Sequence, residues 1–566
     1  MDRNTVIGMV LVAIIIIATP YYMEKVAPIP VEQPAEQQRE VHQSPTPVSE
    51  QSVVTQQAVS PKKVITGSEI DLVELEESLI SVSNVFYEAL ISNKNGGTIV
   101  SFKLNNYNYF DSSLVNLIDK NNQDNLVISG STIDGEAFEL NENWTVSSNV
   151  KKLSAYDAPA SLVFTTSFQG SVISKKLTFN PDTYQIDVEI DFAGSASSLS
   201  QGYYQLGWNG GLPVTEKNEK DDLFYFKGYV FQGDDLHDPK LDKDKTEATE
   251  FRGQTGWVAV RNKYFLAAFL PSTPGVGASL GGHYEDKKPL YNISLYQQAN
   301  GGSKTTLYLG PLEYKRIQAV GLNLDRVMTM GWSIIRPISR GVLMLLMALH
   351  KYIPNYGFIL ILFSVLVKVV VYPLTKKSYQ STRKMQEIQP QITALKEKHK
   401  SDPQKLNKAT MALYKEFGVN PMGGCLPLLL QMPLLFALFQ VFRSTIELRG
   451  APFIFWIRDL SAPDTLMEIG GFPINILPLF MTVTMILQQS MMPTQAGQQK
   501  TMMYAMNIMF LFIFYRFPSG LNLYYTLFNI LTILQQKYLT PHAAAPAPVV
   551  VQKTQKPKPP AVRKKK

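Results

Sequence analysis

One lysine lies inside a long apolar run and is the residue best placed to do chemistry. Lys368 lies within the run 356–375 and is the only charge in the apolar interior of any such run. Ser364 precedes it by one helical turn and therefore shares its helix face. A charge within a membrane is costly and is a functional hypothesis by default. Since no apolar run contains Asp or Glu, this ammonium group requires water. The sequence therefore predicts a hydrated cavity open to the cytoplasm.

Uncharged polar residues in two later apolar runs could line the same cavity. They are Gln431, Tyr524, Tyr525 and Asn529. Two alternatives stay open. Lys368 precedes Lys376 by about 12 Å along a helix, so its side chain could instead extend to the membrane surface. The uncharged groups could instead join neighbouring helices by hydrogen bonds.

The composition excludes several other kinds of site. A single cysteine, Cys425, cannot form a disulfide framework or a cysteine-rich metal site, and the six histidines form no HxxxH-type pair. No phosphate loop or nucleophile elbow occurs. We therefore expect no cofactor, no metal and no enzyme activity. The acidic stretch 216–250 either binds a cation or is a solvated loop.

The apolar runs predict six membrane spans. The first, 5–22, lacks a net basic region before it and a small-residue cleavage site after it, which favours an uncleaved anchor (1–24) over a signal peptide. The run 338–349 is too short to cross a membrane, so 331–355 is predicted to hold an amphipathic helix at the membrane surface. The other five spans are 356–375, 421–442, 473–489, 501–517 and 521–538.

Charge is divided sharply along the chain. Residues 63–330 carry a net charge of −10 and residues 331–566 one of +19. Basic residues gather in the cytoplasmic loops of membrane proteins, and the loop 376–420 holds 10 basic and 4 acidic residues. The sequence therefore predicts both termini and this loop in the cytoplasm, and residues 25–355 largely on the opposite side.

Two contrasting regions separate the anchor from the later spans. Residues 25–62 are rich in Pro, Gln, Glu and Ser, which is typical of a disordered linker. Residues 63–330 alternate β-branched and aromatic residues between Asn-Gly, Gly-Gly and Pro-Asp turns, which predicts a large antiparallel β-sandwich. The expected fold is thus multi-domain, with an α-helical membrane bundle and a β-sandwich outer domain.

The basic loop 376–420, within a core region 356–540, is patterned as a helical hairpin. Asp402 before Pro403 is a typical N-cap and first-turn pair. Together with the basic tail 541–566, the hairpin is expected to bind anionic lipid headgroups or ribosomal RNA. Its apolar positions recur at helical spacing, at Met385, Ile388, Ile392 and Leu395.

Four segments in order resemble the YidC family of bacterial membrane protein insertases, which is related to the Oxa and Albino insertases. They read YPLTKKSYQSTRKMQEIQPQI, MALYKEFGVNPMGGCLPLLLQMPLLFAL, ELRGAPFIFWIRDLSAPD and FPSGLNLYYTLFNILTILQQ. The segments TGWVAVRNKYFLAAFLP, LYLGP and LDRVMTMGW resemble the periplasmic domain of Gram-negative members. The resemblance covers most of residues 63–540.

The resemblance implies a five-helix core in the bacterial inner membrane, with a hydrophilic groove open to cytoplasm and lipid. Lys368 matches a groove position that is usually Arg in the family, so the charge is kept and the planar fork is lost. Ser364, Gln431, Tyr524 and Tyr525 match groove or substrate-contact positions. The resemblance also implies an outer domain of the galactose-mutarotase super-sandwich type. The implied partners are nascent membrane proteins, the Sec translocon, the signal recognition particle with its receptor, and the ribosome.

Two functions from other classes rival that of an insertase. A transporter or channel would use Lys368 as its ion site, and would show inverted repeats or charges paired across spans; the sequence has neither. A carbohydrate-processing enzyme in the outer domain would need a His/Glu pair, and His237 and His283 are the only histidines there. We therefore expect an insertase and chaperone that works without a covalent step.

Overall fold

A computed structural model of the chain describes residues 75–148, 150–242, 248–299, 301–400, 402–418, 426–490 and 498–539. The predicted anchor 1–24, linker 25–62 and tail 541–566 lie outside these residues. The chain divides into two compact units. The β unit contains the described residues up to Thr329 together with Ser444–Glu447, and the helical unit contains those of Met330–Arg443 and those from Leu448 onwards.

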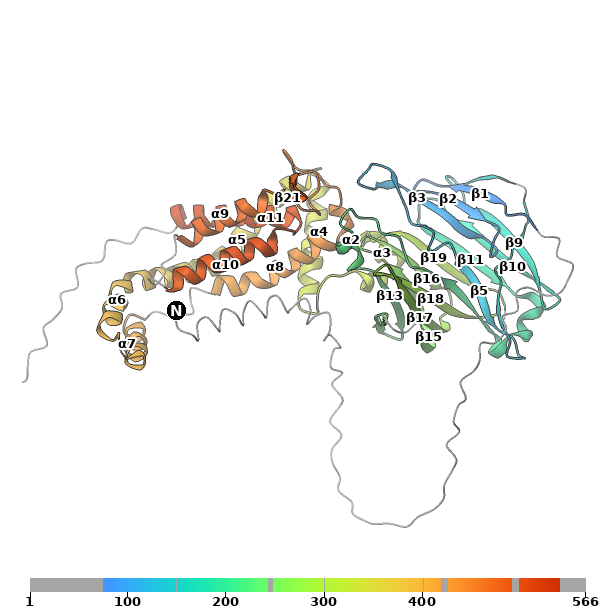
Figure 1. Cartoon of the computed structure of the whole chain (residues 1–566), viewed down its shortest axis with the longest axis horizontal. Helices are drawn as coiled ribbons and strands as arrows, with labels where there is room; N and C mark the ends of the chain where they lie inside the picture. Colours follow the sequence, from blue (N-terminus) through green and yellow to red (C-terminus); the bar gives the residue numbers. More distant parts are fainter. Residues whose placement is uncertain are drawn as a thin grey trace, which may run out of the picture. The chain divides into compact units, whose positions relative to one another are not determined.

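A five-stranded sheet forms one layer of the β unit (Figure 1). Its strand order is β4-β3-β2-β1-β8, and its pairs are antiparallel except for β1 with β8. The strands are β1 (Leu79–Ser83), β2 (Tyr87–Ser92), β3 (Thr98–Asn108), β4 (Leu114–Asn116) and β8 (Lys152–Ser154).

A 14-stranded antiparallel sheet forms the other layer. Its order is β6-β5-β12-β18-β17-β15-β16-β19-β11-β10-β9-β7, with β13 paired to β14 and β15. The strands are β5 (Asn125–Ser131), β6 (Ala137–Glu139), β7 (Thr145–Val146), β9 (Ala160–Phe168), β10 (Ser171–Phe179), β11 (Gln185–Asp191), β12 (Tyr203–Trp208), β13 (Lys227–Gln232), β14 (Asp235–His237), β15 (Thr249–Arg261), β16 (Phe265–Pro271), β17 (Gly275–Glu285), β18 (Lys288–Gln298) and β19 (Ser303–Pro311). The prediction of a large antiparallel β domain is confirmed.

The two sheets pack through apolar side chains that alternate along their strands. The Tyr107 ring on β3 lies edge-on to the Phe265 ring on β16, with centroids 5.7 Å apart. Short helices complete the unit: η1 (Ala193–Ser198), η2 (Ser200–Gly202), α2 (Glu219–Leu223), α3 (Tyr314–Val320) and η3 (Leu324–Val327).

A lysine occupies one of the alternating core positions of β10. Lys175 is fully buried between the buried residues Ile173 and Leu177. Its ammonium donates to the carbonyl oxygens of Asn95 at 2.9 Å and Leu126 at 2.6 Å. Burial away from water disfavours the charged form and lowers the pKa of Lys175 to about 7.

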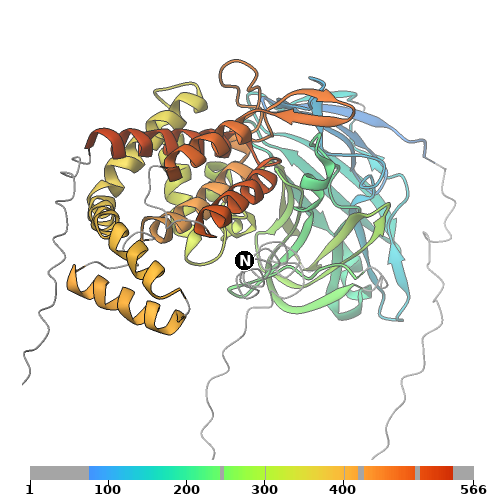
Figure 2. The same ribbon diagram turned by 60° about the vertical axis from the view of Figure 1, so that its left-hand side comes forward.

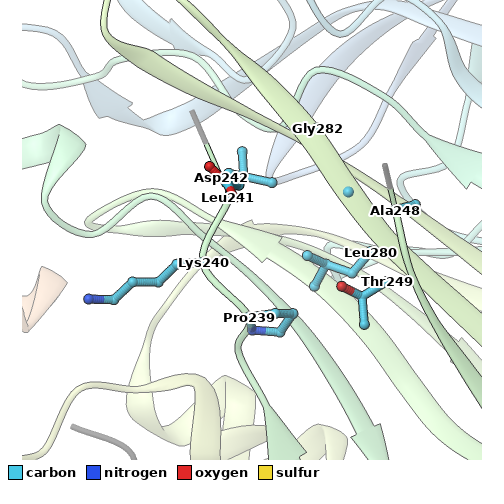
Figure 3. A pocket seen from close by; sticks show the side chains of 9 residues that line it. Pro239, Lys240, Leu241, Asp242, Ala248, Thr249, Leu280 and Gly282 are labelled. Carbon is cyan, nitrogen blue, oxygen red and sulfur yellow. The ribbon is translucent and has the colours of Figure 1, made fainter. Parts of the chain in front are cut away.

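A small surface hollow of about 240 Å³ lies beside β17, next to part of the predicted acidic stretch (Figure 3). Asp242 is the one carboxylate among its lining residues, and Lys240 also borders it. Within the part of the chain that the structure describes, no three His, Cys, Asp or Glu side chains gather as metal ligands. The two interpretations of the stretch 216–250, a cation site and a solvated loop, both stay predictions.

Eight α-helices and a short π-helix make up most of the helical unit among the described residues. In Figure 1, α5, α9, α10 and α11 lie side by side, and α11 packs against both α5 and α9. The elements are α4 (Ile335–His350), α5 (Tyr356–Glu387), α6 (Gln389–Lys398), α7 (Pro403–Glu416), α8 (Leu426–Ser444), α9 (Leu477–Ser490), α10 (Gln498–Phe514), α11 (Ser519–Leu534) and η6 (Gln535–Leu539).

One described helix segment, Tyr356–Pro373 of α5, is long and apolar enough to cross a membrane. Met503–Phe514 in α10 is a shorter apolar stretch. The predicted start of the span 473–489 needs a correction, because residues 473–475 belong to a strand, β21 (Phe472–Asn475), paired with β20 (Thr465–Ile469). The total of six spans stays a prediction.

The basic loop folds as two helices, α6 and α7, which lie side by side in both views (Figures 1 and 2). The Asp402 carboxylate accepts the Lys405 N–H at 3.0 Å, which confirms the predicted N-cap. The first predicted arm differs in one respect, because α5 continues as helix through Glu387. The apolar cluster that joins the helices consists of Ile388, Ile392, Leu413 and Tyr414, with Met385 and Leu395 packed against it.

A cap loop, residues 448–476, closes one end of the helix bundle. The Asp464 carboxylate accepts the backbone N–H groups of Ile476 at 3.0 Å and Leu477 at 2.7 Å, where α9 begins. Carboxylates at a helix N-terminus satisfy amides that have no partner in the helix. At the start of α5, Asn355 donates to the Pro452 carbonyl at 3.2 Å. The cap loop is therefore fastened to the first turns of α5 and α9.

Replacing Gly357 with Ala is expected to destabilise this junction. A Cβ at Gly357 would collide with the Phe453 ring, and overpacking of this kind costs about 1–3 kcal/mol. Thermal unfolding of the detergent-solubilised chain measures the loss. Gly341 in α4 faces open space, so Gly341→Ala is the matched control. An equal effect of both substitutions would contradict the close contact.

Candidate functional site

The site is built on facing stretches of α5 and α11. Tyr524, Phe528, Thr532 and Gln535 follow one another at spacings of four, four and three residues, so they share one face of the helix. Lys368 and Ser364 similarly share one face of α5. Because α5 packs against α11, these two polar faces meet.

The ammonium of Lys368 contacts side chains at the C-terminal end of α11. It donates to the hydroxyl oxygen of Thr532 at 2.5 Å and the amide oxygen of Gln535 at 3.4 Å. It also lies 3.8 Å from the centre of the Phe528 ring, where the negative face of the ring attracts a cation. Among the described residues Lys368 has no carboxylate partner. All three of its partners are therefore uncharged.

Gln431 and Tyr524 extend this site toward α8. The Gln431 amide donates to the Tyr524 hydroxyl at 3.1 Å. Tyr524 is fully buried, and its ring lies 5.8 Å from those of Phe528 and Phe363. A continuous set of contacts thus runs from Lys368 through Phe528 and Tyr524 to Gln431.

The three other predicted site residues make contacts elsewhere. The Ser364 hydroxyl is buried and donates to the Leu360 carbonyl of its own helix at 2.7 Å. Asn529 donates to Thr484 on α9 at 3.3 Å. The Tyr525 ring packs edge-on against Phe514 of α10, with centroids 5.6 Å apart. Asn529 and Tyr525 thus contact α9 and α10, and among the described contacts neither bonds directly to Lys368.

Two family models match the chain over almost all of the described residues. The model described as the YidC periplasmic domain matches residues 79–340, and the model described as the 60Kd inner membrane protein matches residues 348–545. The Membrane protein insertase YidC of Prosthecochloris aestuarii is 35% identical over 99% of each chain. The chain belongs to the YidC family of membrane protein insertases.

Other YidC relatives agree over the full length. Those of Chlorobaculum parvum and Chloroherpeton thalassium are 34% and 33% identical, covering 95% and 100% of this chain and 94% and 100% of theirs. A solved structure described as an active YidC insertase crystal structure matches with a TM-score of 0.36 at 19% identity, over 82% of this chain and 93% of that chain. The family assignment rests on the sequence relatives. It makes this chain a membrane protein of the inner membrane with a large β-rich periplasmic domain.

Phe528 and Gln535 contact Lys368, and the sequence prediction did not select them. An aromatic residue in an apolar span is usually core packing, and Gln535 lies at the end of α11, where polar residues are ordinary. The available signal was their spacing, because both lie on the same helical face as Tyr524.

Replacing Tyr524 with Phe is expected to lower stability by about 1 kcal/mol, because the Gln431 amide loses its hydroxyl acceptor in a partly buried site. Thermal unfolding of the detergent-solubilised chain checks this. The double variant Tyr524→Phe/Gln431→Leu removes both partners and should recover part of the loss. Strictly additive losses would show that the two side chains do not interact in solution.

Proposed function

We propose that this YidC chain inserts nascent membrane proteins through a hydrophilic groove between α5, α8 and α11. The observation that carries the proposal is the seat of Lys368, whose ammonium is held by Thr532, Gln535 and Phe528 without a carboxylate among the described residues. We propose Ser364, Gln431, Tyr524, Tyr525 and Asn529 as further groove residues or as supports for its walls.

Because the partners of Lys368 are uncharged, a carboxylate of a substrate can replace them. A carboxylate brings a full negative charge to the ammonium, which the neutral oxygens of Thr532 and Gln535 lack, so its attraction to Lys368 is stronger. An Asp or Glu in an arriving substrate therefore displaces Thr532 and Gln535 from the ammonium. Entry of a polar segment into a hydrated groove shortens its path through hydrocarbon, where unsatisfied polar groups are costly.

The apolar part of the substrate then leaves sideways into lipid. Exposed apolar side chains on α5 and α9, such as Val369, Val370 and Phe480, form a surface on which it can slide. A membrane potential that is negative inside favours outward movement of each acidic group by about 2.3 kcal/mol per 100 mV. Partitioning and potential together supply a driving force without a covalent step.

The proposed topology has six spans, a five-helix core and both termini in the cytoplasm. The described part of the 376–420 loop, α6 and α7, then faces the cytoplasm, where its basic residues suit ribosomal RNA and anionic lipid. The Sec translocon and the signal recognition particle with its receptor are proposed as further partners on the basis of the family.

Reconstitution tests the proposal directly. The purified full chain is placed in liposomes and supplied with a newly synthesised single-span substrate. Protease protection of the translocated segment, absent in empty liposomes, is the expected result. Protection that appears only when a Sec translocon is added would overturn insertion by this chain alone.

A further inference from the structure

Two apolar tips project from the cap loop, residues 448–476. The first is a turn in which the side chain of Phe455 is 86% exposed and Ile454 is also exposed. The second is the end of the β20–β21 hairpin, where Ile469 and Phe472 are 62% and 55% exposed. Figure 2 shows the hairpin as two orange strands standing out from the helices. Exposed apolar groups gathered at one place mark an interaction surface.

The backbone of the first tip holds Phe455 outward. Phe455 has a φ of 58°, a left-handed conformation that is a genuine outlier for a bulky residue. Hydrogen bonds close the turn around it, from the Phe453 N–H to the Ile457 carbonyl at 2.9 Å and from the Ile457 N–H to the Ile454 carbonyl at 3.3 Å. Strain of this kind persists where the surroundings fix it and clusters at functional sites.

The second tip is equally well fixed. Gly470 and Gly471, with φ values of 58° and 78°, form the turn that places Ile469 opposite Phe472. Every residue of β20 is exposed, whereas β21 is partly buried and the Phe472 ring lies 5.5 Å from that of Tyr515. At its base the Asn475 amide donates to the Tyr515 carbonyl at 2.6 Å, beside the start of α11.

The attachments of the cap loop place both tips at the ends of the helices. Phe453, next to the first tip, packs on the first turn of α5, where its ring lies 5.4 Å from that of Phe358. The span Tyr356–Pro373 begins at this turn. The second tip leads within a few residues to the start of α9 at Leu477. Helix ends of membrane spans lie at the membrane–water boundary, where aromatic side chains are enriched.

Lipid is the partner that suits the exposed apolar side chains of these tips. The adjoining helices also expose apolar side chains, Phe358 and Leu362 on α5 and Leu479 and Phe480 on α9. Glu468, exposed beside Ile469, limits how deeply the hairpin can sit because burying its carboxylate in hydrocarbon is costly. The tips therefore suit the headgroup and upper acyl region of the bilayer, and not its centre.

We propose that the Phe455 turn and the tip of the β20–β21 hairpin are lipid anchors, seated in the interfacial region of the outer leaflet of the inner membrane. This inference rests on the proposed topology, in which the cap loop lies on the periplasmic side. Two anchors on a loop that holds the first turns of α5 and α9 fix the depth of both helices in the bilayer.

Spin labels at the two tips test the anchors. Cys425 is replaced with Ser to remove the single native cysteine, and labels are attached through Phe455→Cys and Phe472→Cys. Phe110→Cys in the β unit is the control, because Phe110 is 73% exposed. In liposomes of phosphatidylethanolamine and phosphatidylglycerol, labels at the tips should collide more with oxygen than with a water-soluble nickel chelate. The control label should show the reverse.

Two results would overturn the anchors. Water-like collision rates at both tips would place them in solvent, and shielding from both reagents would show a protein occupant. A second measurement keeps Phe455 and Phe472 unchanged: brominated lipids should quench wild-type fluorescence more than that of Trp456→Phe, because Trp456 stacks beside Phe455. Insertion is assayed on the same chains to separate the lipid anchors from the proposed insertase function. Normal insertion by a chain whose tips are exposed to solvent would overturn the anchors and leave the insertase function standing.

Discussion

Replacing Lys368 with Met is expected to slow insertion about tenfold for a substrate with Asp or Glu in its translocated segment. A matched substrate with a neutral segment should insert at nearly the wild-type rate. Tenfold corresponds to about 1.4 kcal/mol, which lies near the lower end of the roughly 1–4 kcal/mol that two charges 4 Å apart gain between bulk water and a protein surface. Initial rates of protease protection in liposomes measure both substrates.

The fold should survive this substitution. The Thr532 hydroxyl also donates to the Phe528 carbonyl at 2.6 Å, so removing the ammonium does not leave it without a partner. Lys368→Arg keeps the charge and is the control that should insert both substrates normally. If Lys368→Met slowed both substrates equally, or neither, the side chain would have no electrostatic role, as expected if it only extends to the membrane surface.

Unfolding of the β unit is expected to show a pH dependence that comes from Lys175. Its pKa is about 7 in the folded chain and close to 10.4 when unfolded, so the folded state binds fewer protons between these values. Stability therefore rises with pH across this window, by at most about 1.4 kcal/mol per unit, and becomes independent of this group below pH 7. Urea unfolding of the purified β unit from pH 7 to pH 10 measures the slope.

A comparison of variants isolates Lys175 from every other titrating group. In Lys175→Met the contribution of Lys175 to the pH dependence of the unfolding free energy should disappear. The carbonyl oxygens of Asn95 and Leu126 also lose their donor. Lys176 is the matched control, because it lies on the opposite face of β10 and is partly exposed beside Glu189. Lys176→Met should keep the wild-type slope. Parallel pH curves for wild type and Lys175→Met would contradict the burial of a titrating amine.

Periodicity and charge predicted much of this molecule. The alternation of β-branched and aromatic residues predicted an antiparallel β domain, and the polar residues of the last apolar run predicted Tyr524 at the site. Lys368 was identifiable because a cation in an apolar run has few explanations. These signals are local, so a single sequence is enough to detect them.

Features that depend on tertiary contacts were not predictable in the same way. Lys175 follows the alternation of a core position, but a lysine in a strand normally faces solvent. Only the carbonyls of Asn95, in the β2–β3 connection, and of Leu126 on β5 explain its burial. The β20–β21 hairpin escaped prediction because its first strand does not alternate and is exposed throughout. Asn529 and Tyr525 share a helix with Tyr524, yet their contacts are with α9 and α10, which the sequence pattern did not indicate.

The helix α5 has a point of bending close to the site. It runs unbroken from Tyr356 to Glu387, a rod of about 48 Å at 1.5 Å per residue. Pro373 lies within it, and since proline removes one backbone hydrogen bond, the rod flexes most readily there. Lys368 lies a little more than one turn from this pivot. Bending at Pro373 therefore lets α6 and α7 tilt while the segment of α5 that carries Lys368 stays packed against α11.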